Sequence, residues 1–178
     1  MKREQKIFIN ALALFIVVAS LAVTALAQDV AVVDAAPDQV LEGAALTRVV
    51  PVSFYFEGQA APTQMRNAAA ALVNNRHVIA GMVDTSGYSA DVRAHYQGFF
   101  ITDGAIKING KSLPIGAYGF GFTNDGKFNI LDIGNHEVLT VSSTSDKALK
   151  RPRPLMMTMD GRNVRLYAGR DYVVIAVK

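Results

Sequence analysis

The second half of the chain alternates between short apolar stretches and turn-forming residues, and this alternation limits the possible fold more than any other feature. From Gly98 onward, runs of β-branched and aromatic residues are separated by Asp103-Gly104, Asn109-Gly110, Asp125-Gly126, Gly134-Asn135 and Asp160-Gly161. Turn signals at spacings of roughly eight to twelve residues are typical of antiparallel β architectures. The sequence therefore predicts a mainly β domain, an antiparallel β-sandwich or a partly closed barrel.

The first half of the domain is less regular. One short helix is predicted in SADVRAHYQ, residues 89–97, where Ser89 can cap the first turn. Residues 68–72 favour a helix by propensity, but Asn74-Asn75 is typical of a hairpin turn, and we predict two strands around it. TRVVPVSFYFEG, residues 47–58, is predicted as a strand because β-branched and aromatic residues dominate it.

The N-terminal 27 residues have the three parts of a secretory signal peptide. Basic residues at positions 2, 3 and 6 precede an almost wholly apolar stretch, and Ala25-Leu26-Ala27 fits the small-x-small cleavage pattern. Cleavage near Ala27 predicts a periplasmic or secreted protein, and a retained membrane anchor is the alternative. Residues 28–45 are predicted to be a linker or loosely ordered N-terminal arm, with a short helical turn at 38–43. Residues 46–178 are predicted to form the β-sandwich domain.

Composition excludes several classes of function. The chain has no Cys, so it has neither disulfides nor a thiol nucleophile. Its formal charge of +3 falls to +1 when residues 1–27 are set aside, and this balance does not predict nucleic-acid binding. The sequence holds no phosphate-cradling glycine loop and no closely spaced histidine pair, so we predict neither a cofactor nor a metal site.

The stretch GMVDTSGYSA, residues 81–90, resembles the way in which aspartic proteases present a catalytic carboxylate. Two apolar residues precede Asp84 and Thr85, but Ser86 shifts the following glycine out of the position that the active-site turn requires. The alternative is a turn in which the Asp, Thr and Ser side chains bond the backbone and lead into the helix.

A second stretch, YAGRDYV (residues 167–173), is similar to the apolar-Gly-Arg-Asp segment of retroviral-type aspartic proteases. In that family a helix follows, whereas here a strand-like segment ends the chain. The resemblance implies a homodimer that uses Asp84 as general acid and base on water, with Thr85 orienting the carboxylate and Gly169 behind it. Two carboxylates that share a proton are the basis of that chemistry.

The strand-like segment AYGFGF places two kinds of side chain on opposite faces, because side chains alternate along a strand. Tyr118, Phe120 and Phe122 share one face, and Gly119 and Gly121 lie on the other. Glycines at alternate positions predict a close neighbour. That neighbour is either a bulky group of the chain itself or a ligand on the bare backbone. The aromatic face either fills the core or lines the interior of a carrier for a small apolar ligand.

The segment KALKRPRP gathers positive charge, with prolines that hold it extended. Its basic residues are Lys147, Lys150, Arg151 and Arg153. The functional interpretation is a patch that meets an anionic envelope surface or another protein. The alternative is a solvated loop.

IKINGKSLPIGAYGFGF, LKRPRPL and RLYAGRDYV together resemble small secreted bacterial proteins of unknown function. In these, a GKxLPxGxYxF hairpin precedes the last strands of a β-sandwich. The resemblance covers roughly residues 48–177, implies a β-sandwich outside the cytoplasm, and brings no catalytic residues to carry over to this chain. We therefore expect an exported, non-catalytic binding or envelope-associated accessory module. The protease-like hydrolase and the apolar-ligand carrier remain as alternatives.

Overall fold

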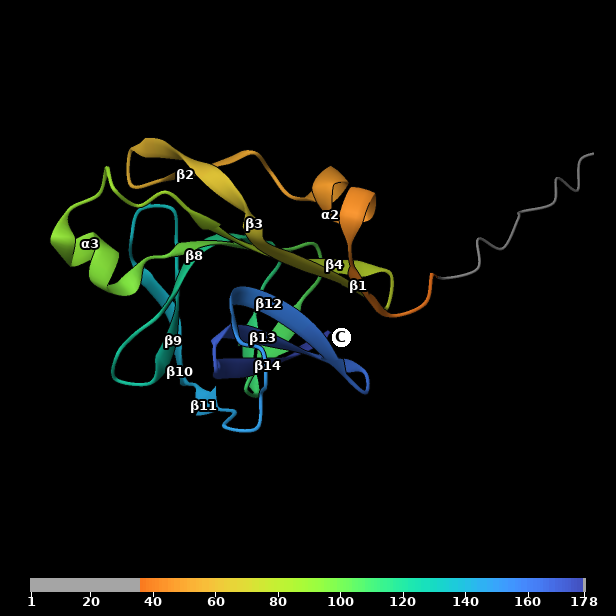
Figure 1. Ribbon diagram of the computed structural model, residues 1–178. Helices are drawn as coiled ribbons and strands as arrows, with labels where there is room; N and C mark the ends of the chain where they lie inside the picture. Colours follow the sequence, from red (N-terminus) through yellow and green to blue (C-terminus); the bar gives the residue numbers. More distant parts are fainter. Residues whose placement is uncertain (1–35, 178) are drawn as a thin grey trace, which may run out of the picture. The chain divides into compact units, whose positions relative to one another are not determined.

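A computed structural model describes residues 36–177, so the predicted signal peptide and the first residues of the predicted arm lie outside the described range. Within it, the strands form two antiparallel sheets, accompanied by two short helices (Figure 1). Each sheet is open and has two terminal strands. The predicted mainly antiparallel β fold is confirmed: the two sheets are consistent with a sandwich, and they do not close into a barrel.

The eight-stranded sheet has the order β1-β3-β4-β5-β8-β9-β10, and β2 pairs with β3 outside this path. Its strands are β1 (Gln39–Leu41), β2 (Ser53–Phe56), β3 (Gln59–Val73), β4 (Arg76–Val83), β5 (Gly98–Thr102), β8 (Gly116–Phe122), β9 (Lys127–Leu131) and β10 (Glu137–Ser142).

The six-stranded sheet has the order β12-β13-β14-β6-β7, and β11 pairs with β14. Its strands are β6 (Ile106–Ile108), β7 (Lys111–Leu113), β11 (Thr144–Ser145), β12 (Arg153–Asp160), β13 (Asn163–Gly169) and β14 (Asp171–Val177). The helices are α2 (Gly43–Val49) and α3 (Ala90–His95).

The eight-stranded sheet is buried on both faces. Its inner face packs on the six-stranded sheet, where Phe100, Phe120 and Phe128 meet Leu166 and Ile175 in one cluster. Its outer face carries a second cluster, covered by apolar side chains of β2 and of the segment around α3. Burial on both faces explains why β4 and β5 read as nearly continuous apolar runs rather than as alternating ones.

The predicted hairpin turns are present. Asn74 and Asn75 have φ of 50° and 58°, and Asn109 and Gly110 have φ of 45° and 85°. Positive φ at both central residues is the geometry of the two-residue turn that matches strand twist. The turn after β3 also settles the ambiguous segment: residues 68–73 pair with β4, so strand pairing overrides the helical propensity of the alanines.

The predicted helix is present as α3, and the Ser89 hydroxyl accepts a hydrogen bond from the Val92 N–H at 3.3 Å. A second helix was not predicted. Residues 43–49 form α2 rather than a strand, with Leu46 and Val49 turned towards the outer cluster. Pro51 explains why the helix stops there, because the residue before a proline is pushed into an extended conformation.

The prediction of a loosely ordered arm is wrong for residues 39–45. Gln39–Leu41 form β1, a terminal strand that pairs with Ala70–Leu72 of β3, where a short helical turn was expected. Leu41 is buried in the outer cluster. A strand of three residues is too short to show the alternation from which strands are recognised in sequence.

Candidate functional site

Asp84 shapes a turn. Its side chain is exposed and accepts a hydrogen bond from the Ser86 backbone N–H at 3.0 Å. This bond holds the pKa of the Asp84 carboxyl below its ordinary value. The Thr85 carbonyl accepts from the Tyr88 N–H at 3.1 Å, which leads the chain into α3. The arrangement is the turn alternative, in which the Asp84 carboxylate bonds the backbone of its own turn.

Gly169 lies apart from this turn in the architecture. It ends β13 of the six-stranded sheet, where it pairs with Arg153, whereas Asp84 follows β4 of the eight-stranded sheet. Its φ of 63° serves the tight turn into β14. The residues that the protease resemblance combines, Asp84, Thr85 and Gly169, therefore belong to two different sheets.

Strand β8 faces protein on both sides. Phe120 is fully buried between the sheets, Phe122 lies beside it, and Tyr118 packs at the margin of the same cluster. On the other face, a Cβ built at Gly119 would lie 2.5 Å from the Phe56 ring, and one at Gly121 would lie 2.2 Å from the His95 carbonyl oxygen. The chain's own atoms fill the space above both glycines, which is the packing alternative.

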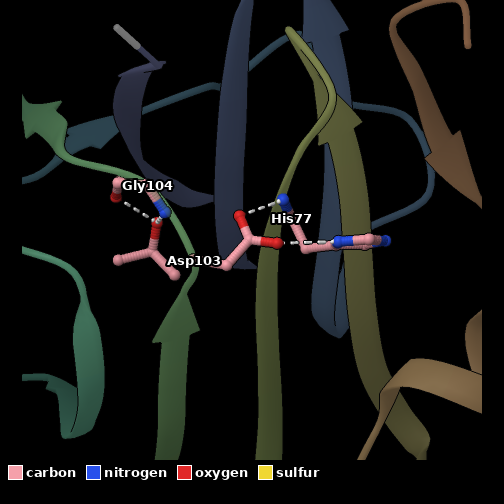
Figure 2. A network of polar contacts seen from close by, with 4 residues as sticks. His77, Asp103 and Gly104 are labelled. Carbon is pink, nitrogen blue, oxygen red and sulfur yellow. Dashed lines mark hydrogen bonds and ion pairs between the residues drawn. The ribbon is translucent and has the colours of Figure 1, made fainter. Parts of the chain in front are cut away.

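Figure 2 shows a network of polar contacts around His77 and Asp103. Asp103 accepts from the His77 backbone N–H at 2.7 Å and contacts its ring Nδ1 at 2.9 Å. The neighbouring Thr102 hydroxyl, which is buried, donates to the Gly104 carbonyl at 2.7 Å. Because that hydroxyl is engaged with the backbone, the network has no free nucleophile and instead ties the start of β4 to the turn after β5.

A groove of about 830 Å³ opens where the two sheets part beside β3. We call it the basic groove, and it is lined by residues 40–43, Leu46, Arg66, Ala68, Ala69, residues 149–151, Arg153 and residues 155–157. These residues come from β1, α2, β3, β12 and the loop before β12. In Figure 1, β12 runs below β1 and α2, and β12 lies against β3.

The pairing of β3 explains the opening. β2 pairs with residues 59–62 of β3, and β1 pairs with residues 70–72. Between them, the Thr63 backbone N–H still donates to the Val52 carbonyl at 2.9 Å, and the pairing of β3 with β4 shifts register between Thr63 and Ala68. One edge of β3 is therefore uncovered over several residues, and Arg66 projects from this irregular stretch, because bulges re-aim side chains.

The charge of the basic groove is strongly unequal. Arg66, Lys150, Arg151 and Arg153 line it together with a single carboxylate, Glu42. Among the ion pairs within residues 36–177, none involves any of these four cations. All four side chains belong to exposed residues. The groove therefore presents a concentrated positive potential that an anion can neutralise.

The loop that carries Lys150 and Arg151 is held in place by its neighbours. The Arg170 guanidinium donates to the carbonyls of Asp146, Lys147 and Leu149. The Asp146 carboxylate accepts from the backbone N–H groups of Ala148 and Leu149 at 3.0 and 3.1 Å. These bonds hold residues 146–149 at the start of the loop, and Lys150 and Arg151 follow directly.

The groove contains part of the predicted basic patch. Lys150, Arg151 and Arg153 line it, whereas Lys147 does not. Sequence reasoning missed Arg66, since no local signal connects residue 66 with the segment around residue 150. Their proximity depends on the packing of β12 against β3, which is a property of the tertiary structure.

Comparisons with known proteins add no relative: no family model, no curated protein and no solved structure matches this chain. Within residues 36–177, no helix has both the length and the apolar composition needed to cross a bilayer. In the same range, no three His, Cys, Asp or Glu side chains gather where they could hold a metal ion. The basic groove is therefore judged on its own geometry and charge.

Proposed function

We propose that this chain is an exported, non-catalytic binding module whose basic groove binds an anionic ligand of the cell envelope. The observation that supports the proposal is the gathering of four cations without ion pairs in the described range around one groove. Residues 28–178 carry a net charge of only +1, so this cluster is not a reflection of a generally basic chain. Export rests on the predicted signal peptide and on the resemblance to secreted β-sandwich proteins.

The two alternatives have less support. The hydrolase depends on Asp84, whose carboxylate is exposed and bonded within its own turn, with a lowered pKa. A carrier that holds its ligand among the aromatic side chains of β8 would need free space between the sheets, but Phe120 and Phe128 are fully buried there against other side chains. The basic groove, by contrast, is an opening of about 830 Å³ lined by four cations.

The proposal is tested with vesicles. We expect the purified chain to bind vesicles that contain phosphatidylglycerol and not vesicles of phosphatidylcholine alone. The variant Lys150→Gln/Arg151→Gln/Arg153→Gln removes three cations of the groove. Each basic residue near an anionic surface contributes about 1 kcal/mol, so the variant should bind roughly a hundredfold more weakly.

A matched control separates the groove from general charge. Arg93, Lys107 and Arg162 are exposed and line no part of the basic groove. The variant Arg93→Gln/Lys107→Gln/Arg162→Gln has the same net charge as the groove variant and should keep nearly the wild-type affinity. Equal losses in the two variants would show that the groove is not the binding site, and the proposal would be abandoned.

A further inference from the structure

The floor of the basic groove differs chemically from its rim. Leu155 and Met157 of β12 and Leu41 of β1 are at most 8% exposed and belong to the two core clusters, so the floor is continuous with the core. Leu46 of α2 adds a partly buried apolar side chain. A ligand that satisfies both parts of the groove needs an apolar portion and an anionic end, because buried apolar area and paired charge favour binding separately.

We infer that the ligand is a single-chain anionic lipid, whose hydrocarbon chain lies on the apolar floor and whose phosphate or carboxylate meets Arg66, Lys150, Arg151 and Arg153. This inference rests on the proposed function and names its ligand class. The guanidinium groups suit a phosphate or carboxylate, because their planar donors bind two oxygens at once.

The opposite side of the sandwich has a smaller groove of about 390 Å³, and hydrogen bonds bridge the two sheets there. There β10 and β7 are the terminal strands of the two sheets. The Asn109 side chain donates to the Ser142 carbonyl at 2.7 Å, and the Lys111 ammonium donates to the Thr140 carbonyl at 2.9 Å. Side chains of one sheet thus cap backbone carbonyls of the other. Between β1 and β12 the corresponding space is the basic groove.

The start of β12 argues against an added peptide strand as the occupant. Strand addition needs backbone N–H and C=O groups along a regular edge. Pro154 has no N–H, and the register of β12 shifts between Arg153 and Met156. Prolines, basic side chains and bulges are the devices that keep terminal strands from pairing. An acidic peptide would therefore find few main-chain partners where the cations lie, whereas a lipid needs none.

The test uses four soluble probes and calorimetric titration of the purified chain: dodecyl phosphate, octyl phosphate, inorganic phosphate and dodecyl maltoside. All are kept below their micelle concentrations. Each buried methylene contributes up to about fourfold in affinity. We expect dodecyl phosphate to bind at least tenfold more tightly than octyl phosphate and than dodecyl maltoside, with inorganic phosphate weakest.

A second variant separates the chain from the headgroup. Ala68 is a partly buried residue that lines the groove, and Ala68→Leu narrows the floor without touching the cations. It should weaken dodecyl phosphate binding at least tenfold and so reduce the advantage of dodecyl phosphate over inorganic phosphate. Ala117→Leu, at an exposed alanine of β8 outside the groove, is the control and should leave dodecyl phosphate binding unchanged.

The outcomes distinguish the two proposals. If inorganic phosphate binds as tightly as dodecyl phosphate, the lipid inference is overturned and the anionic-ligand function stands. If dodecyl maltoside binds as tightly as dodecyl phosphate, charge has no role and both fail. Binding of a glutamate-rich peptide without binding of dodecyl phosphate would overturn the inference in favour of a peptide site.

Discussion

Placing one methyl group on Gly121 should destabilise the fold strongly, because the end of α3 sits directly on the backbone of β8. A Cβ at this position would lie 2.2 Å from the His95 carbonyl oxygen and 2.7 Å from its carbonyl carbon. Both are backbone atoms, so no rotamer change relieves the contact. In Gly121→Ala the helix end must move by about an ångström or β8 must bend.

The helix end cannot move without loss. The Gln97 backbone N–H donates to the Phe120 carbonyl at 2.8 Å, and its side chain donates to the Phe122 carbonyl at 3.0 Å and accepts from the Phe122 N–H at 3.1 Å. Overpacking costs about 1–3 kcal/mol, and each broken hydrogen bond about 1 kcal/mol more. Replacing a strand glycine recovers roughly 0.5–1 kcal/mol. The net loss should be about 2–4 kcal/mol.

Urea unfolding followed by far-ultraviolet circular dichroism measures this loss, since the chain has no Trp. With a slope of about 2 kcal/mol per molar urea, the midpoint of Gly121→Ala should fall by roughly 1–2 M. Ala117→Val, on the same face of β8 but exposed, is the control and should change stability by no more than about 0.5 kcal/mol. If Gly121→Ala is as stable as this control, α3 does not cover β8, and the glycine face becomes a candidate ligand site again.

Four individual side chains allow further tests. The buried Tyr96 hydroxyl has no hydrogen-bond partner in the described range, so Tyr96→Phe should retain or raise stability in urea unfolding, by up to about 1–3 kcal/mol. Tyr88→Phe should lose about 1 kcal/mol of unfolding free energy, because the Tyr88 hydroxyl donates to the Phe56 carbonyl at 3.2 Å. Both predictions are refuted if Tyr96→Phe proves less stable than Tyr88→Phe. Backbone hydrogen bonds, first that of His136, lower the pKa of Asp132 below 3.8, so its stabilisation is complete above pH 3.8 and is lost as the pH falls through the folded-state pKa. Asp132→Ala should therefore lower the melting temperature at pH 7 and converge with the wild type in acid, and a difference independent of pH would contradict this. Asp84→Asn should leave the melting temperature nearly unchanged at pH 7, because an amide oxygen can still accept the turn hydrogen bond, and a large loss would contradict the turn assignment.

The sequence predicted the parts of the fold that depend on neighbouring residues. Asn109 and Gly110 tolerate the positive φ that the hairpin turn requires, and the Ser89 hydroxyl accepts from the Val92 N–H. Both effects act within a few residues. The two faces of β8 followed from the alternation of side chains, including the demand for a close neighbour above its glycines. The identity of that neighbour could not be predicted, because Phe56 and α3 are brought there by tertiary packing.

The basic groove likewise depends on tertiary packing. The edges of two strands explain why it forms. Pro154 and the register shift in β12 could be expected from KRPRP to keep a terminal strand from pairing. That β1 covers only three residues of β3 could not be expected, since strand length depends on which partner is available. β12 pairs with β13 on one edge and with no strand of the described range on the other, and β1 covers only three residues of β3. Together these leave a space between the two sheets. Arg66 from β3 and Arg153 from β12 both line that space, so an anion that binds between them should stabilise the fold as well as fill the groove.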